Sequence, residues 1–223
     1  MRFLLIDTCG ATGSVALAED GAMRQIKIAG RSSGEQLIPA VREAMGGLPL
    51  ARLDAIAVVN GPGSFTGVRI GVSAAKGLAE AVGVRLIAVS RLAVLAAKSA
   101  QTDCAHAVLD AGRGEFYHGL YGTSFGPSEA LVKREDLAAS LAEWPGLVLV
   151  CEEEVAKALS DFKPVEVSPP TAVDALPLAL RAFEKGEFAD VGELDGNYLR
   201  RAEVEMLARQ KLLEARAAAD CSR

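Results

Sequence analysis

The sequence is poor in the residues that most often build metal and nucleophilic centres. Its 223 residues include only two histidines and four cysteines. The cysteines lie far apart, without a C-x-x-C pair, so the sequence predicts neither a zinc site nor a disulfide framework and we expect buried, reduced thiols. His106 and His118 cannot form the i, i+4 pair of a helical metal motif, and we interpret each as a packing or surface residue. The cysteines are Cys9, Cys104, Cys151 and Cys221.

Long apolar runs and an excess of positive charge are also missing. No window approaches the roughly 18 apolar residues of a membrane-spanning helix. The apolar run before Asp7 is too short for a signal peptide, so we expect a cytoplasmic protein. A net charge of -5 and a pI near 5.2 argue against a nucleic-acid-binding surface as the main function. Any contact with RNA is therefore expected to come through a local patch or through a partner.

The most informative stretch reads as strand, tight loop and helix. Ala55–Val59 is a β-branched apolar run, Asn60–Gly67 is rich in glycine, and a helix with small residues follows as far as Val82. Thr66 is the predicted N-cap of that helix. The spacing is not that of a Walker loop, because no lysine follows the last glycine of the loop.

Two interpretations of this loop stay open. Glycines that permit positive φ allow close backbone approach, either to a phosphate at a helix N-terminus or to a neighbouring strand and helix. An acidic residue where the first strand ends can order a metal-bound water beside a phosphate, or can cap a turn. The candidates for a phosphate or nucleotide site are Asp7, Thr8, Gly61, Gly63 and Gly67.

Before this stretch the pattern predicts a three-stranded meander and a helix, and after it another strand and helix. An Asp-Gly pair at residues 20–21 is a hairpin signal. Pro39 is expected near the first turn of its helix. Strands alternating with helices after a hairpin indicate an α/β fold with a mixed sheet. The predicted strands are 3–6, 14–18, 23–28 and 85–89, and the predicted helices are 34–45 and 90–98.

A second lobe is predicted after the polar break at residues 99–103. Its opening, a short strand followed by Asp110 and a glycine-rich turn, echoes the start of the chain and indicates an internal duplication. We assign residues 1–100 to an N-terminal lobe, 101–200 to a shorter C-terminal lobe and 201–223 to a C-terminal helix. The second lobe is predicted to contain strands at 106–109, 115–121, 129–132 and 146–150 and helices at 135–141, 152–159 and 172–185, with a final helix at 202–219.

Several motifs in this order resemble the TsaB (YeaZ) family and span nearly the whole chain. The block from Asn60 to Gly71, NGPGSFTGVRIG, is the most specific. The other matching segments are IDT at 6–8, SVAL at 14–17, EQLIP at 35–39, AKGL at 75–78, DAGRGE at 110–115 and NYLR at 197–200.

The resemblance implies an α/β fold of the actin/Hsp70/sugar-kinase type, with two lobes of duplicated topology. It also implies a non-catalytic subunit that binds TsaD, with the ATPase TsaE, to make N6-threonylcarbamoyladenosine on tRNAs that read ANN codons. A homodimer and a nucleotide at the complex interface are further possibilities that it raises. The family pairs through helices of the first lobe, which here gives a docking face of Glu35, Leu37, Ile38, Val41, Met45, Arg69, Val72, Ala75, Lys76 and Ala79.

Two other functions of related folds compete with this one. An M22-type metalloprotease or sialoglycoprotease needs a histidine metal motif after the strand that follows the glycine loop, and Val89–Leu95 contains no ligand. A small sugar or acetate kinase needs an adenosine-binding loop in the second lobe, and none is recognisable. We therefore expect no catalytic residues, no intrinsic metal and no intrinsic cofactor.

Overall fold

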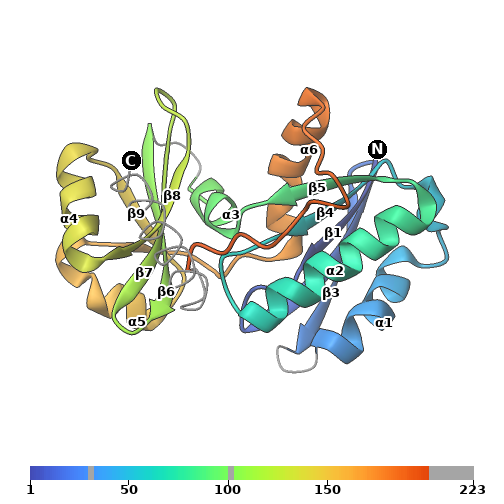
Figure 1. Cartoon of the computed structure of the whole chain (residues 1–223), viewed down its shortest axis with the longest axis horizontal. Coiled ribbons are helices and arrows are strands. Elements are labelled where there is room, and N and C mark those ends of the chain that lie inside the picture. Colours follow the sequence, from blue (N-terminus) through green and yellow to red (C-terminus); the bar gives the residue numbers. More distant parts are fainter. Residues whose placement is uncertain (30–32, 100–102, 201–223) are drawn as a thin grey trace, which may run out of the picture.

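Two five-stranded sheets of the same design make up the protein (Figure 1). The computed structural model describes residues 1–29, 33–99 and 103–200. The strand order is β3-β2-β1-β4-β5 in the first sheet and β8-β7-β6-β9-β10 in the second. In each sheet the first strand in the chain pairs antiparallel with the second and parallel with the fourth. The predicted duplication is therefore confirmed.

The first sheet joins a three-stranded meander to two parallel strands. Asp20 and Gly21 have φ values of 47° and 88°, and positive φ at both positions is what a two-residue hairpin turn of type I′ requires. All the predicted strands of this lobe are confirmed. They are β1 (Arg2–Asp7), β2 (Thr12–Glu19), β3 (Ala22–Ala29), β4 (Ala55–Val59) and β5 (Arg85–Val89).

Helices cover both faces of the first sheet, which is why every residue of the continuous apolar strand β4 is buried. α1 (Ser33–Met45) and α2 (Phe65–Val82) lie side by side on one face, joined through the short 3₁₀ turn η2 (Leu50–Arg52) and β4. α6 (Leu176–Lys185) lies on the other face (Figure 1).

Two details of these helices differ from the sequence prediction. The N-cap of α2 is Ser64, whose hydroxyl accepts a hydrogen bond from the Gly67 N–H at 3.2 Å, whereas Thr66 already lies inside the helix. Pro39 lies in the second turn of α1 rather than in the first. Proline has no N–H, so the Glu35 carbonyl loses its helical donor. Glu35 is exposed, and water can supply that hydrogen bond instead.

Most of the expected docking face points into the core. The side chains concerned are at most 6% exposed and pack between the helices and the sheet. The docking assignment of these residues is wrong, because the periodicity of an amphipathic helix identifies an apolar face without identifying what covers it. These residues are Leu37, Val41, Met45, Val72, Ala75 and Ala79.

The second lobe repeats the plan with shorter elements. α4 and α5 cover one face of its sheet and α3 the other. The predicted strands and helices of this lobe are confirmed, with β6 extending through Asp110 as far as Gly112. The elements are β6 (Cys104–Gly112), β7 (Glu115–Gly122), β8 (Ser128–Lys133), α4 (Arg134–Glu143), β9 (Leu147–Val150), α5 (Glu153–Ala158), η3 (Ser160–Phe162) and β10 (Val165–Glu166).

The chain then returns to the first lobe. η4 (Ala172–Ala175) and α6 bury their alanines in the first core, and the ring of Phe183 packs edge-on against Phe3 with centroids 5.3 Å apart. Residues 101–200, which we assign to the second lobe from the sequence, thus include a segment that packs on the first sheet and completes the first lobe. The expected helix at 202–219 lies outside the described residues.

α3 (Arg91–Ala97) is shared by the two lobes. Leu92 and Leu95 belong to the apolar cluster on the second sheet, while Val94 belongs to the core of the first. Ser90 caps the helix by accepting a hydrogen bond from the Leu92 N–H at 3.2 Å. The two cores therefore share the same seven-residue helix.

The turn after β1 lies directly against the start of α2. The Thr8 hydroxyl donates to the Gly67 carbonyl at 2.6 Å, and the Ser64 N–H donates to the Cys9 carbonyl at 2.9 Å. A Cβ atom on Gly67 would lie 2.0 Å from the Thr8 carbonyl oxygen, and one on Gly63 would lie 2.4 Å from the Cys9 carbonyl oxygen. Close backbone approach, rather than positive φ, is the reason for glycine at these two positions.

A hydrogen-bonded histidine pair lies in the second lobe. His106 and His118 are at most 6% exposed, and their rings stack with centroids 5.1 Å apart. The Trp144 carbonyl can only accept, so His106 Nε2, 2.8 Å away, must carry a proton. His106 Nδ1 is then the acceptor for the His118 Nε2–H at 2.9 Å. The pair is buried and neutral, which confirms packing residues rather than surface ones.

We expect Gly67→Ala to destabilise the protein by about 1–3 kcal/mol, because the new methyl group would overlap the Thr8 backbone. Gly77→Ala in the same helix is the matched control: nothing lies within 4 Å of its Cβ position, so the higher helix propensity of alanine should stabilise by up to about 1 kcal/mol. Urea unfolding measures both variants. Equal stability of the two would contradict the packing argument.

The histidine pair predicts a loss of stability in mild acid. Burial, together with the neighbouring His106, lowers the pKa of His118 from 6.5 to about 4. Between pH 6.5 and 4 the unfolded chain therefore binds a proton at His118 that the folded chain does not bind. The free energy of unfolding is highest above pH 6.5 and falls as the pH drops toward 4. This group contributes a loss on the order of 3 kcal/mol. Urea midpoints across this range should fall less steeply for His118→Gln than for the unsubstituted protein; parallel curves would refute the assignment.

Candidate functional site

The residues expected to hold a phosphate pack within the first lobe instead. Asp7 and Thr8 are each 1% exposed. The Asp7 carboxylate accepts from the Cys9 N–H at 2.9 Å, and burial raises the pKa of this carboxyl despite the nearby Arg91 guanidinium. Gly61 alone of the three loop glycines has positive φ, at 105°. This geometry favours the tight-packing interpretation of the loop over the phosphate-binding one.

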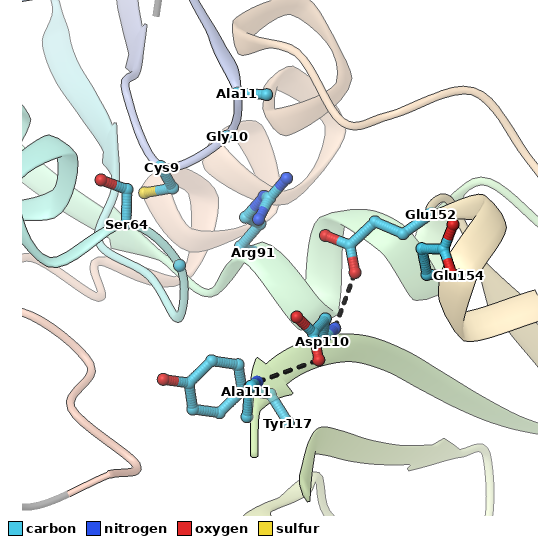
Figure 2. Close-up of a pocket in the computed structure, with 12 residues that line it drawn as sticks. Cys9, Gly10, Ala11, Ser64, Arg91, Asp110, Ala111, Tyr117, Glu152 and Glu154 are labelled. Carbon is cyan, nitrogen blue, oxygen red and sulfur yellow. Dashed lines mark hydrogen bonds between the residues drawn. The ribbon is translucent and has the colours of Figure 1, made fainter. Parts of the chain in front are cut away.

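A cavity of about 800 Å³ lies beside this loop, and residues of both lobes line it. The first lobe contributes the turn after β1 and the glycine loop, and the second contributes the end of β6 and the start of α5. Figure 2 shows Arg91 projecting from the start of α3 into the space between the Cys9–Ala11 turn and Glu152. The lining residues are Cys9, Gly10, Ala11, Gly63, Ser64, Arg91, Asp110, Ala111, Gly112, Tyr117, Glu152 and Glu154.

Hydrogen bonds hold the acidic wall of the cavity in place. Glu152 Oε2 accepts from the Asp110 N–H at 2.6 Å, and Asp110 Oδ1 accepts from the Gly112 N–H at 2.9 Å (Figure 2). The Asp110 turn was visible in the sequence, as half of the internal duplication. The role of Arg91 was not, because no sequence motif surrounds it.

The chemistry of the cavity is poor in nucleophiles. Burial raises the pKa of the Cys9 thiol, which lines the cavity, well above its ordinary value. Burial also raises the pKa of Cys151, which is outside the lining, to about 11. Both thiols are therefore protonated at neutral pH and unreactive. Within residues 1–29, 33–99 and 103–200, no group of three or more His, Cys, Asp or Glu side chains is arranged to hold a metal ion.

A second candidate surface lies on the outward side of α1 and α2. Phe65 is 55% exposed at the start of α2, and Arg69 lies over its ring at 4.0 Å from the centroid. Ile38 is 41% exposed on α1, and Glu35 one turn before it is exposed. We call Glu35, Ile38, Phe65 and Arg69 the α1–α2 outer surface. Three of them were expected to dock a partner, and Phe65 was missed because it stands in the glycine loop rather than on the apolar stripe.

Lys76, also expected on the docking face, is engaged within the chain. Its ammonium group donates to the carbonyls of Gly192 and Leu194 at 3.1 and 2.9 Å. It thereby ties α2 to the segment that returns from the second lobe. None of the helices in the described part of the chain is long and apolar enough to cross a membrane.

Comparison with known proteins identifies relatives over about nine-tenths of the chain. A family model described as TsaD, tRNA N6-adenosine threonylcarbamoyltransferase, matches residues 25–161. The tRNA threonylcarbamoyladenosine biosynthesis protein TsaB of Escherichia coli K12 is 33% identical over 90% of this chain and 95% of that protein. TsaB of Bacillus subtilis 168 is 34% identical over 92% of this chain and 96% of that protein.

Solved structures agree with these sequence matches. A Pseudomonas aeruginosa protein described as uncharacterized, with similarity to the peptidase YeaZ, superposes with a TM-score of 0.75 at 30% identity, over 89% of this chain and 99% of that one. This likeness, with the duplicated sheets, confirms the actin/Hsp70/sugar-kinase-like fold class. On sequence and on structure, the chain belongs to the TsaB (YeaZ) family.

Proposed function

We propose that this protein is a non-catalytic subunit in the biosynthesis of N6-threonylcarbamoyladenosine on tRNA and that it acts by binding TsaD. The match to proteins named for this pathway, at 33–34% identity over about nine-tenths of the chain, is the observation that carries the proposal. The tRNAs concerned are those that read ANN codons. We propose that this protein contacts them only through the complex, in the cytoplasm. The net charge of -5 supports an indirect contact.

A non-catalytic role is supported by the donor chemistry of the cavity. The Cys9 thiol that lines it is protonated, and the buried histidines are paired with each other instead of lining the cavity. The side chains that an M22-type metalloprotease would use for its metal are not assembled in the described ranges. Metal analysis of the purified protein tests that alternative, and nucleotide titration tests the small kinase.

The α1–α2 outer surface is the face we propose for TsaD. Each of the two neighbouring helices exposes an apolar side chain, Ile38 or Phe65, with a charged one near it, Glu35 or Arg69. An exposed aromatic ring with an arginine beside it is typical of a residue that carries binding energy in an interface. TsaE would join the pair, and any bound nucleotide would lie at the interface of the complex. Without TsaD, the same surface would form a two-fold homodimer.

The function itself is tested by reconstitution. We expect TsaD and the other pathway components to form threonylcarbamoyladenosine on tRNA only when this chain is present, and this chain without TsaD to form none. Mass spectrometry of digested tRNA measures the product. Full product formation without this chain, or formation by this chain without TsaD, would contradict the proposal.

The docking surface is tested by a matched pair of substitutions. Ile38→Asp puts a carboxylate into the proposed interface, and we expect it to weaken TsaD binding at least a hundredfold, about 2.7 kcal/mol, with the thermal midpoint nearly unchanged because the residue is 41% exposed. Val165→Asp, at a residue 42% exposed in the second lobe, is the control and should bind normally. Calorimetric titration with TsaD measures both. Equal affinities would show that TsaD docks elsewhere.

A further inference from the structure

Arg91 is a buried cation on the wall of the cavity between the lobes. The residue is 6% exposed, and its Nε atom is buried without a hydrogen-bond partner. Its backbone N–H is used, donating to the Gly61 carbonyl at 2.7 Å. Its guanidinium group, in contrast, forms no ion pair with a described residue, although it lines the cavity. The buried Asp7 carboxyl is near enough to interact with this charge, but it makes no hydrogen bond or ion pair with the guanidinium group. Burying a guanidinium group without such contacts is costly, so the position favours binding of a further anion.

Asp7, the carboxyl group behind Arg91, does not fill this role. It is fully buried, its Oδ1 atom accepts from the Cys9 N–H, and it does not line the cavity. Arg91 lines the cavity, and Figure 2 shows its side chain between the Cys9–Ala11 turn and Glu152. A guanidinium group binds a carboxylate through two parallel N–H···O bonds, which sets both the distance and the plane of the bound group.

The turn after β1 offers further donors on the same wall. Gly10 and Ala11 line the cavity, and in the part of the chain that the structure describes their backbone N–H groups have no acceptor. A side chain at residue 10 would approach Arg91, because a Cβ atom there would lie 3.0 Å from one terminal guanidinium nitrogen. Glycine thus allows the Arg91 guanidinium group to lie directly against this turn.

The opposite wall has the other sign. Asp110, Glu152 and Glu154 line it, and Asp110 and Glu152 are each oriented by one backbone N–H at 2.9 and 2.6 Å. The negative charge of this wall would repel a polyphosphate, so a nucleotide does not suit this cavity. A small molecule with one negative and one positive group would match Arg91 on one wall and the carboxylates on the other.

We propose that the cavity binds a free α-amino acid, with its carboxylate on Arg91 and its ammonium group facing Glu152 and its acidic neighbours. This site goes beyond the proposed docking function and shares no residue with the α1–α2 outer surface. It places a small-molecule ligand in a subunit to which we assign no chemistry. Because the ligand would contact both lobes, its binding would also favour one relative position of the two.

The experiment compares two probes of similar size on the intact protein. L-alanine carries both charges, and propionate carries only the carboxylate; their dissociation constants are measured by NMR titration. We expect both to bind saturably and L-alanine to bind at least tenfold more tightly, about 1.4 kcal/mol. Arg91→Met should weaken both at least tenfold. Glu152→Gln should weaken L-alanine and leave propionate unchanged or tighter.

Glu153→Gln is the control for Glu152→Gln, because Glu153 pairs with Lys157 at 2.7 Å and does not line this cavity. It should bind both probes as the unsubstituted protein does. Thermal midpoints of all variants report folding, so a misfolded Arg91→Met leaves the Glu152→Gln comparison decisive. No saturable binding, or no preference for L-alanine that depends on Glu152, would overturn the proposal. TsaD titration of the same variants should be normal, which separates this proposal from the docking one.

Discussion

The close contact between the turn after β1 and the start of α2 is the constraint on which the rest of the structure depends. Two backbones meet there with no side chain between them, at Thr8–Cys9 and at Gly63–Gly67. The contact seats α2 on β1 and β4, and α1 then packs beside α2. The glycines of this loop allow that close approach of the two backbones.

Sharing α3 between the sheets has a comparable effect on the two lobes. Because its leucines belong to the second core and Val94 to the first, the helix cannot leave one sheet without disturbing the other. The return of η4 and α6 to the first sheet adds a second connection. The cavity lies beside the start of α3, so Arg91 is positioned by the same element that holds the lobes together.

The two faces of α1 and α2 have different surroundings. The inward face supplies the core, and its small residues allow the helices to approach the sheet closely. The outward face keeps an aromatic and an aliphatic side chain in solvent, which the fold of the single chain does not require. A subunit that works by binding needs little else, and the pathway assignment and the surface are consistent with each other.

Local patterns were enough to predict the strands, the Asp20–Gly21 hairpin and the duplicated order, because each depends on periodicity or on turn chemistry within a few residues. The docking stripe failed because α2 is rich in small residues on every side. Sequence spacing shows that Ala75 and Ala79 share a face, but only contact with the sheet shows that this face is inward.

The buried histidine pair, the unpartnered Arg91 and the packing of η4 and α6 on the first sheet had no local signal. Each depends on residues far apart in the chain: His106 on Trp144, Arg91 on the turn after β1, and Phe183 on Phe3. The periodicity of a helix or strand shows which of its faces is apolar, but it does not show which distant residue a given side chain contacts. Burial of a charge or a ring against a distant segment is set by how the elements assemble, and that information is not present in any one stretch of the sequence.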